Sequence, residues 1–293
     1  MATAILEKLD FSLKFSPLNL ITECLKNKKY GAIATIFDRE GEVDVKIGSR
    51  FFVYPDNMTY TDIQEKNLKN AITDDTIHAK NTRKSTSTVN KYQLESGSVE
   101  VFIDVIKPPT SLILFGAGRD VLPVVKLAKE IGWHVTVVDC RAQEKTYQRF
   151  AFADKIILTR RDIISQQISI KENDLAVVMT HNYFDDYNII KFLLQTKIAY
   201  LGVMGSKNRI AKIIEELNPT KNQLEKLYSP IGLDIGADTP AEIANAIISE
   251  IQAVLTKRNA SFLKYRSQPL HQKYDVQEKQ IINPKQRLKI EEK

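Results

Sequence analysis

The chain has 293 residues, 43% of them hydrophobic and 27% charged, with a formal net charge of +6 at pH 7. At roughly 100–200 residues per domain this length suggests two domains, and the composition is that of a chain that buries a core rather than a disordered one. No apolar run reaches eighteen residues and the start lacks an apolar leader segment, so we expect no membrane helix and no signal peptide.

The positive charge is concentrated at the C-terminus. From Lys257 to Lys293 there are ten Lys or Arg and four Asp or Glu, a balance of +6, so the rest of the chain is neutral. We interpret 259–293 as a basic polar tail that is solvated and has no nucleic-acid or membrane partner. Cys24 and Cys140 have no metal-ligand spacing, which argues against a disulfide scaffold and favours a cytoplasmic protein.

Residues 1–110 are predicted to form a small α+β domain. Pro17 opens an amphipathic helix over 17–29, with Leu20, Ile21 and Leu25 on one face. We then expect strands at 31–37, 43–47 and 51–55, a short helix within 61–72, a loop over 73–91 and a hairpin with arms at 91–95 and 99–106. Lys107-Pro108-Pro109 ends the last strand and marks the domain boundary.

Residues 111–258 have a different sequence pattern, in which apolar strands alternate with helical segments. The strands are expected at 111–115, 134–139, 155–159, 174–180 and 198–202. This alternation implies right-handed crossovers and a parallel sheet covered by helices on both faces. The fold class is therefore α/β, with a Rossmann-like parallel-sheet domain preceded by the smaller α+β domain.

The first of these strands runs into a glycine-rich turn. Gly116 permits the tight turn, and Gly118 lets the backbone approach a pyrophosphate at the N-terminus of the next helix. Asp139 ends the second strand 21 residues after Gly118, where a carboxylate can accept hydrogen bonds from ribose hydroxyls. The pattern favours nucleotide-type binding, although Val121 replaces the third glycine of the usual fingerprint.

Other polar residues follow the later strands, at the edge where open parallel sheets bind ligands. His181 follows the fourth strand and is equally compatible with a ligand contact and with a packing role. Asp185 and Asp186 begin the next helix, where interaction with the helix dipole is the favoured role. Gly205, Ser206 and Arg209, together with Lys207, form either an anion site or a capped helix with a solvated basic face.

The densest motif is the segment 232–242. Thr239 to Glu242 predicts a capping box, with Pro240 at the first helical position. Asp234 and Gly236 precede this helix and are candidates for lining a site. No nucleophile–base pair, zinc pattern or paired carboxylate is visible, so the sequence predicts a binding site rather than a catalyst.

These segments together resemble the XdhC/CoxI family of molybdenum-enzyme accessory proteins. The resemblance is carried by VEVFIDVIKPP (99–109), LILFGAG (112–118), VTVVDCR (135–141), VVMTHN (177–182), YLGVMGSKNR (200–209) and PIGLDIGADTPAEIANAI (230–247). The N-terminal domain diverges from the family pattern: Ser96-Gly97-Ser98 stands where members often have Cys-Gly-Gly.

The resemblance implies a cytoplasmic chaperone that binds molybdenum cofactor (molybdopterin), protects it during sulfuration and inserts it into a xanthine dehydrogenase-type molybdoenzyme. It also implies a homodimer and a cysteine desulfurase as a second partner. Ten residues are carried over as the ligand site: Gly116, Gly118, Asp139, Arg141, His181, Gly205, Ser206, Arg209, Asp234 and Gly236. We expect no metal-ligand residues and no catalytic residues.

Two other functions remain open. The glycine turn and Asp139 also suit NAD(P), as in an oxidoreductase, although no substrate domain with an acid/base residue is evident. A nucleotide-sensing regulatory domain is the third alternative. Cys24 and Cys140 are both expected to pack rather than to react.

Overall fold

The computed structural model describes residues 16–82, 87–141, 143–267 and 276–280. These residues divide into two compact units. The N-terminal unit comprises the described residues up to Pro108 together with 276–280, and the C-terminal unit comprises Pro109–Ser267. Among the described residues, no helix is both long and apolar enough to cross a membrane.

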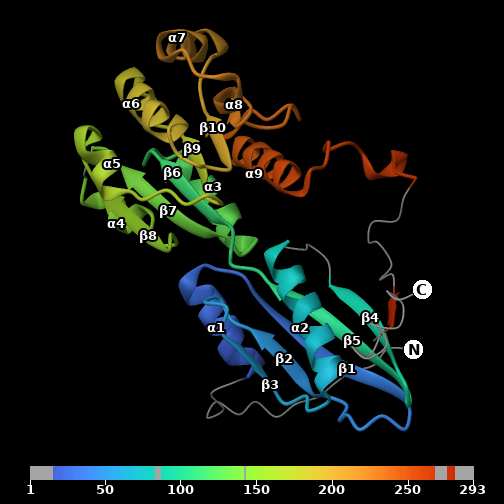
Figure 1. The fold of residues 1–293 in the computed structure, drawn as a ribbon. Helices are drawn as coiled ribbons and strands as arrows, with labels where there is room; N and C mark the ends of the chain where they lie inside the picture. Colours follow the sequence, from blue (N-terminus) through green and yellow to red (C-terminus); the bar gives the residue numbers. More distant parts are fainter. Residues whose placement is uncertain (1–15, 83–86, 142, 268–275, 281–293) are drawn as a thin grey trace. The chain divides into compact units, whose positions relative to one another are not determined.

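The N-terminal unit is built on a six-stranded sheet in the order β12-β4-β5-β1-β2-β3 (Figure 1). Its elements are α1 (Pro17–Asn27), β1 (Gly31–Gly41), β2 (Arg50–Val53), β3 (Thr59–Thr61), α2 (Lys66–Asn81), β4 (Thr88–Leu94), β5 (Gly97–Ile106) and β12 (Val276–Gln280). Side chains alternate between the two faces of a strand. Phe51 and Val53 accordingly pack with the core beneath α2, whereas Phe52 and Tyr54 pack against α1.

The sequence correctly predicted helix α1 but not its buried face. Leu20 and Cys24 are fully buried, whereas Ile21 and Leu25 are 37% and 47% exposed. Cys24 therefore packs in the core, as expected, and its burial raises the pKa of the thiol to about 11. The face was misjudged because cysteine at the i+4 position, rather than the larger leucine and isoleucine, completes the apolar stripe with Leu20.

We expect Leu20→Ala to lower the free energy of unfolding of the N-terminal unit by about 2–3 kcal/mol, because it leaves a cavity between α1 and β2. Ile21→Ala removes a similar side chain from the exposed side of the same helix and should change stability by less than about 0.5 kcal/mol. Urea unfolding followed by circular dichroism compares the two variants. Equal losses would mean that α1 does not pack by the Leu20 face.

The expectation of a loop over 73–91 was wrong. Helix α2 continues to Asn81 and strand β4 begins at Thr88. The polar residues that suggested a loop are instead paired in the interior: Tyr92 Oη donates to Asp75 Oδ2 over 2.6 Å, and Lys80 Nζ donates to the Tyr54 carbonyl over 2.7 Å. A buried polar group with a hydrogen-bond partner is compatible with a core element.

The expected strand at 43–47 is also absent. Val43 and Val45 are buried, but the segment pairs with no strand among the described residues. Their carbonyl oxygens accept hydrogen bonds from Arg39 Nη1 over 2.9 and 2.6 Å. A guanidinium from β1 thus satisfies the backbone that a neighbouring strand would otherwise pair.

A strand lies within the segment interpreted as a polar tail. Strand β12 pairs in parallel with β4, from Val276 opposite Val89 to Gln280 opposite Gln93. Lys279 of this strand forms an ion pair with Asp75 on α2. The sequence of β12 contains a single apolar residue, so its pairing depends on the open edge of β4 and not on an apolar pattern.

The C-terminal unit is the expected Rossmann-like α/β domain. All its strands are parallel, in the order β11-β10-β9-β6-β7-β8. The strands are β6 (Ser111–Phe115), β7 (His134–Asp139), β8 (Lys155–Leu158), β9 (Leu175–Val178), β10 (Tyr200–Val203) and β11 (Leu227–Tyr228). The sequence-based predictions of β6 and β7 agree with the structure at both ends, and those of β8, β9 and β10 differ by one to three residues.

Helices cover both faces of this sheet (Figure 1). The helical elements of this unit are α3 (Val121–Glu130), α4 (Lys145–Arg149), η1 (Arg161–Ile163), α5 (Ile164–Gln167), α6 (Tyr183–Leu194), α7 (Lys207–Leu217), α8 (Lys221–Leu224), α9 (Pro240–Thr256) and the exposed η2 (Leu263–Tyr265). Leu112 and Leu114 of β6 pack with α3 and α9, whereas Ile113 and Phe115 pack with α6 and α7.

The strand order reverses at β6. The chain runs from β6 outward through β7 to β8, then crosses to β9 on the other side of β6 and continues to β10 and β11. The carboxyl ends of β6 and β9 therefore meet at a topological switch point. In open α/β sheets ligands bind in the crevice at such a point.

Candidate functional site

The glycine turn after β6 is shaped by close contact with β9. Gly116 has φ +135°, and a methyl group built on it would lie 2.4 Å from the Met179 carbonyl oxygen. Arg149 of α4 donates from Nη1 to the Ala117 carbonyl over 2.6 Å. Only glycine fits position 116, and the turn is held from two sides.

A histidine–carboxylate pair crosses the switch point. His181 Nε2 lies 2.7 Å from Asp120 Oδ2 and donates to it. The backbone of His181 is left-handed, with φ +57°, a conformation that is uncommon outside glycine but in which asparagine, aspartate and histidine are enriched. The side chains of His181 and Asp120 are 55% and 25% exposed, so both are accessible to a ligand.

Asp139 lies at the end of β7, as predicted, but its carboxylate is occupied. It is 2% exposed and accepts hydrogen bonds from Thr146 Oγ1 over 2.6 Å and from the Arg141 backbone N–H over 3.0 Å. These contacts fix the loop after β7. The Arg141 side chain stays 57% exposed, with Nε 3.8 Å from Asp139 Oδ1, so it faces solvent.

The two aspartates at the start of α6 do more than interact with the helix dipole. Asp186 is fully buried and its Oδ2 lies 2.9 Å from Arg209 Nη2. Asp185 is 5% exposed and its Oδ1 lies 2.8 Å from Arg161 Nε. Burial raises the pKa of Asp186, while the Thr180 hydroxyl and Arg209 oppose that rise. Asp186 therefore ties α6 to α7, and Asp185 ties α6 to η1.

The segment after β10 begins a capped helix and supplies Arg209, the ion-pair partner of Asp186. Ser206 is the N-cap of α7 and accepts from the Arg209 N–H over 3.4 Å. The Arg209 guanidinium lies over Gly205, where an added methyl group would be 2.6 Å from Nη2. Arg209 is thus engaged by Asp186, and Lys207 is the exposed cation of this segment.

The loop before α9 is exposed but anchored. Asp234 and Gly236 both face solvent, as does Ile235 with 52% exposure. The Gly232 N–H donates to Glu250 Oε2 over 3.1 Å, which fixes the start of the loop. The predicted capping box of Thr239 and Glu242 closes its end.

The ten predicted site residues thus all follow carboxyl ends of strands in one sheet. Contacts join Gly116 and the His181 loop across the switch point, and join Gly205 to Arg209. Asp120, Arg149 and Arg161 were missed by sequence reasoning. Their roles depend on partners 24–61 positions away, and no local pattern signals such pairs.

Neither cysteine offers a reactive thiolate. Cys140 follows Asp139, and burial together with the charges of Asp185 and Asp139 raises the pKa of its thiol to about 12. A thiol with so high a pKa is protonated at neutral pH and is a poor nucleophile. Among the residues that the structure describes, no group of three or more His, Cys, Asp and Glu could hold a metal ion.

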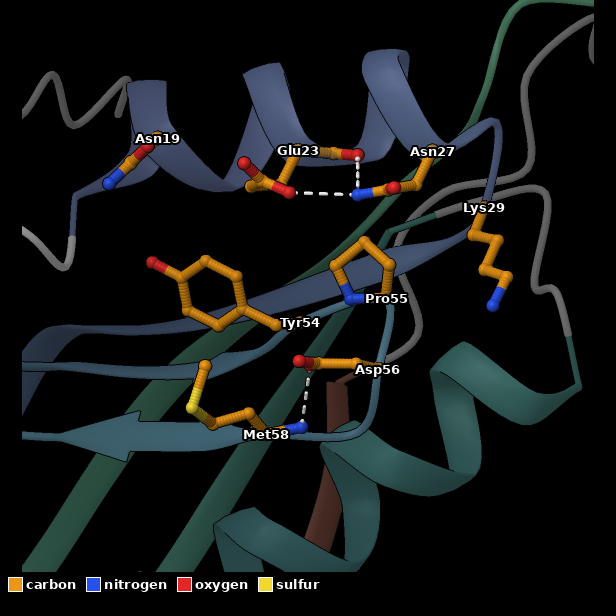
Figure 2. A pocket seen from close by; sticks show the side chains of 8 residues that line it. All are labelled: Asn19, Glu23, Asn27, Lys29, Tyr54, Pro55, Asp56 and Met58. Atoms are coloured by element: carbon orange, nitrogen blue, oxygen red, sulfur yellow. Dashed lines mark hydrogen bonds between the residues drawn. The ribbon is translucent and has the colours of Figure 1, made fainter.

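The N-terminal unit has a cavity of ≈ 360 Å³ between α1 and the β2–β3 turn. It is lined by Asn19, Glu23, Asn27, Lys29, Tyr54, Pro55, Asp56 and Met58. Figure 2 shows that Glu23 and Asn27 bind each other, with 2.8 Å between Glu23 Oε2 and Asn27 Nδ2. None of the ten predicted site residues lines this cavity.

Comparison with known proteins gives a family match within the C-terminal unit and several similar proteins. Residues 112–251 match the XdhC Rossmann domain. A probable xanthine dehydrogenase subunit from Bacillus subtilis is 38% identical over 154 residues, covering 53% of this chain and 46% of that protein. "Uncharacterized protein YqeB" of Escherichia coli is 26% identical over 168 residues, covering 56% of this chain and 30% of that protein.

The chain therefore spans less than half of the length of these two curated relatives. Among solved structures, a xanthine dehydrogenase from Bacillus halodurans matches with a TM-score of 0.50 and 20% identity. The match covers 85% of this chain and 98% of that one. At this level of identity the likeness shows the fold.

Proposed function

We propose that this chain, whose residues 112–251 match the XdhC Rossmann domain, is an accessory protein that serves a xanthine dehydrogenase-type molybdoenzyme. In this proposal its cargo is the molybdenum cofactor, a pterin-based molecule. The chain binds the cofactor, protects it while a cysteine desulfurase supplies sulfur, and transfers it to the enzyme. A homodimer is the proposed assembly.

The observation that carries the proposal is the switch point between β6 and β9. Two backbone features converge there: the tight glycine turn and the left-handed loop of His181. The imidazole of His181 is exposed there, and the exposed guanidinium of Arg141 follows the neighbouring strand β7. Such an edge offers hydrogen-bond donors to a polar ring or an anion, which is what recognition of a pterin requires.

The same site favours binding over turnover. The Cys140 thiol is held protonated, so it is unsuited to accept sulfur by nucleophilic attack. Asp185 and Asp186 are committed to ion pairs within the fold. The remaining titratable pair, His181 with Asp120, is accessible to solvent and suits the recognition of a ligand.

An NAD(P)-dependent oxidoreductase is the second candidate, because Asp139 ends β7 at the position from which a carboxylate binds ribose. Both of its oxygens already accept hydrogen bonds from Arg141, Gln143 and Thr146. A ribose hydroxyl would have to share one of them. Because the Asp139 carboxylate is already engaged in these hydrogen bonds, we rank the oxidoreductase below the cofactor-binding function.

The test is to identify the ligand that the purified protein carries. The full chain is produced without oxygen in a host that makes molybdenum cofactor, passed through gel filtration and denatured. We expect molybdenum and fluorescent oxidised pterin in near-equal amounts to the protein. NAD(P) without pterin would instead support the oxidoreductase, and neither ligand would contradict both functions.

A variant links the ligand to the switch point. Gly118→Val is expected to reduce the retained pterin at least about tenfold, since a side chain there would displace the Asp120 carboxylate that lies over the glycine turn. The nearest neighbour of an added methyl group is a side-chain oxygen of Asp120 and not backbone, so the variant should fold. Gly132→Ala, in a turn with open space around it, is the matched control and should retain the ligand fully. Equal retention by both variants would remove the glycine turn from the site.

A further inference from the structure

The carboxylate of Asp120 lies where a bound phosphate would approach the glycine turn. A methyl group built on Gly118 would be 2.2 Å from Asp120 Oδ1, so this oxygen fills the space above the glycine. In dinucleotide-binding turns the second glycine lacks a side chain so that a pyrophosphate can reach the backbone. In this chain its own carboxylate occupies that approach.

Asp120 is held in place by the neighbouring strand end and not by its own helix. It immediately precedes α3, yet its side chain makes no capping hydrogen bond there. Its Oδ2 instead accepts from His181 Nε2 over 2.7 Å. The left-handed backbone of His181 sets the direction of the loop after β9, so the carboxylate is fixed between the two strands of the switch point.

Charge then decides which ligand group the turn accepts. A carboxylate at the N-terminus of α3 already uses the favourable end of the helix dipole, and a phosphate beside it would meet a like charge. A carboxylate is in turn a strong acceptor for N–H groups. The 2-amino-4-oxo ring of a pterin presents an amino group next to a ring N–H, which matches two carboxylate oxygens. The Asp120 side chain is 25% exposed and can accept from such a ring.

We infer that Asp120 is a specificity-determining residue of the ligand site, which keeps phosphate groups out of the glycine turn and accepts the ring N–H groups of a pterin. His181 acts through it as a positioning residue. This inference rests on the proposed function, because it assigns a part of the same edge of the sheet.

The experiment measures how one substitution in the full chain changes the affinity for each of two ligands. Calorimetry gives the affinity for neopterin, which has the pterin ring and no phosphate, and for ADP-ribose, which has a pyrophosphate and no pterin. Asp120→Asn keeps the size of the side chain and removes its charge. We expect it to weaken neopterin binding about tenfold and to strengthen ADP-ribose binding about tenfold, since a charged hydrogen bond is lost and a repulsion is relieved.

Asp162→Asn is the matched control. Asp162 is an exposed carboxylate after β8 that pairs with Arg160, so the substitution makes the same change in net charge away from Gly118. It should leave both affinities within about twofold. A second variant, His181→Asn, keeps a residue that tolerates the left-handed backbone and shortens the donor. It should weaken neopterin binding less than Asp120→Asn does.

The results distinguish the role of Asp120 from the proposed function of the chain. Opposite shifts of the two affinities in Asp120→Asn alone support the role of Asp120. If neopterin binds the unsubstituted chain and Asp120→Asn changes neither affinity, the role of Asp120 is wrong while the proposed function stands. If neopterin binds neither the unsubstituted chain nor any variant, the proposed pterin site itself is contradicted.

Discussion

Replacement of Gly116 by alanine is expected to lower the free energy of unfolding of the C-terminal unit by about 4 kcal/mol, which combines backbone strain with a forced shift of packed atoms. The φ of +135° disfavours any side chain, and the new methyl group would lie 2.4 Å from the Met179 carbonyl oxygen. This neighbour is backbone of the segment after β9 and cannot move independently of the sheet.

Chemical unfolding followed by circular dichroism measures the effect. Gly132→Ala is the matched control, because Gly132 also has a positive φ, of +79°, but has no atom within 4 Å of an added methyl group. Backbone strain alone should lower the free energy of unfolding of Gly132→Ala by about 1 kcal/mol. A loss of similar size in both variants would show that the contact between the glycine turn and β9 does not constrain position 116.

Loss of the Arg209 guanidinium should have a comparable effect. Arg209→Met is expected to destabilise the C-terminal unit by about 3–4 kcal/mol, because it leaves the fully buried Asp186 without its cation. The exposed pair of Arg160 and Asp162, 76% and 55% exposed, provides the control. Arg160→Met should cost less than about 1 kcal/mol, as exposed ion pairs do.

A double-mutant cycle isolates the interaction of Asp186 with Arg209. In the background of Asp186→Asn the buried charge is already gone, so Arg209→Met should then cost about 2 kcal/mol less than in the unsubstituted chain. The four proteins are compared by urea unfolding at constant pH. Additive losses would mean that the two side chains stabilise the fold independently.

The sheet of the C-terminal unit could be predicted from the sequence because its strands are continuous apolar runs. A strand buried on both faces needs no alternation, and the segments LILF (112–115) and VTVV (135–138) are bounded in the sequence by polar residues or glycine. The N-terminal unit could be predicted less well. Asp75 and Lys80 are polar residues inside a packed element, and their partners lie on other strands or at the far end of the chain.

In the candidate site, too, the residues of a local motif could be predicted and the pairs of distant residues could not. Gly116, Gly118 and Asp139 follow from a local spacing motif, and the structure places them at the ends of β6 and β7. The pairing of Asp120 with His181 joins positions 61 residues apart, and it exists because the strand order reverses between them. The buried state of Asp186 likewise depends on Arg209, which the chain reaches only after another strand and turn.

The pairing of β12 with β4 has a consequence for synthesis on the ribosome. Residues 95–275, which include the whole C-terminal unit, separate the two strands in sequence. At about 5–20 residues per second, translation of that stretch takes roughly 10–40 s. During that interval the nascent N-terminal sheet carries β4 as an unprotected border that another chain could pair with. Lys91, in the middle of β4, is the kind of charged residue that discourages such pairing until β12 emerges.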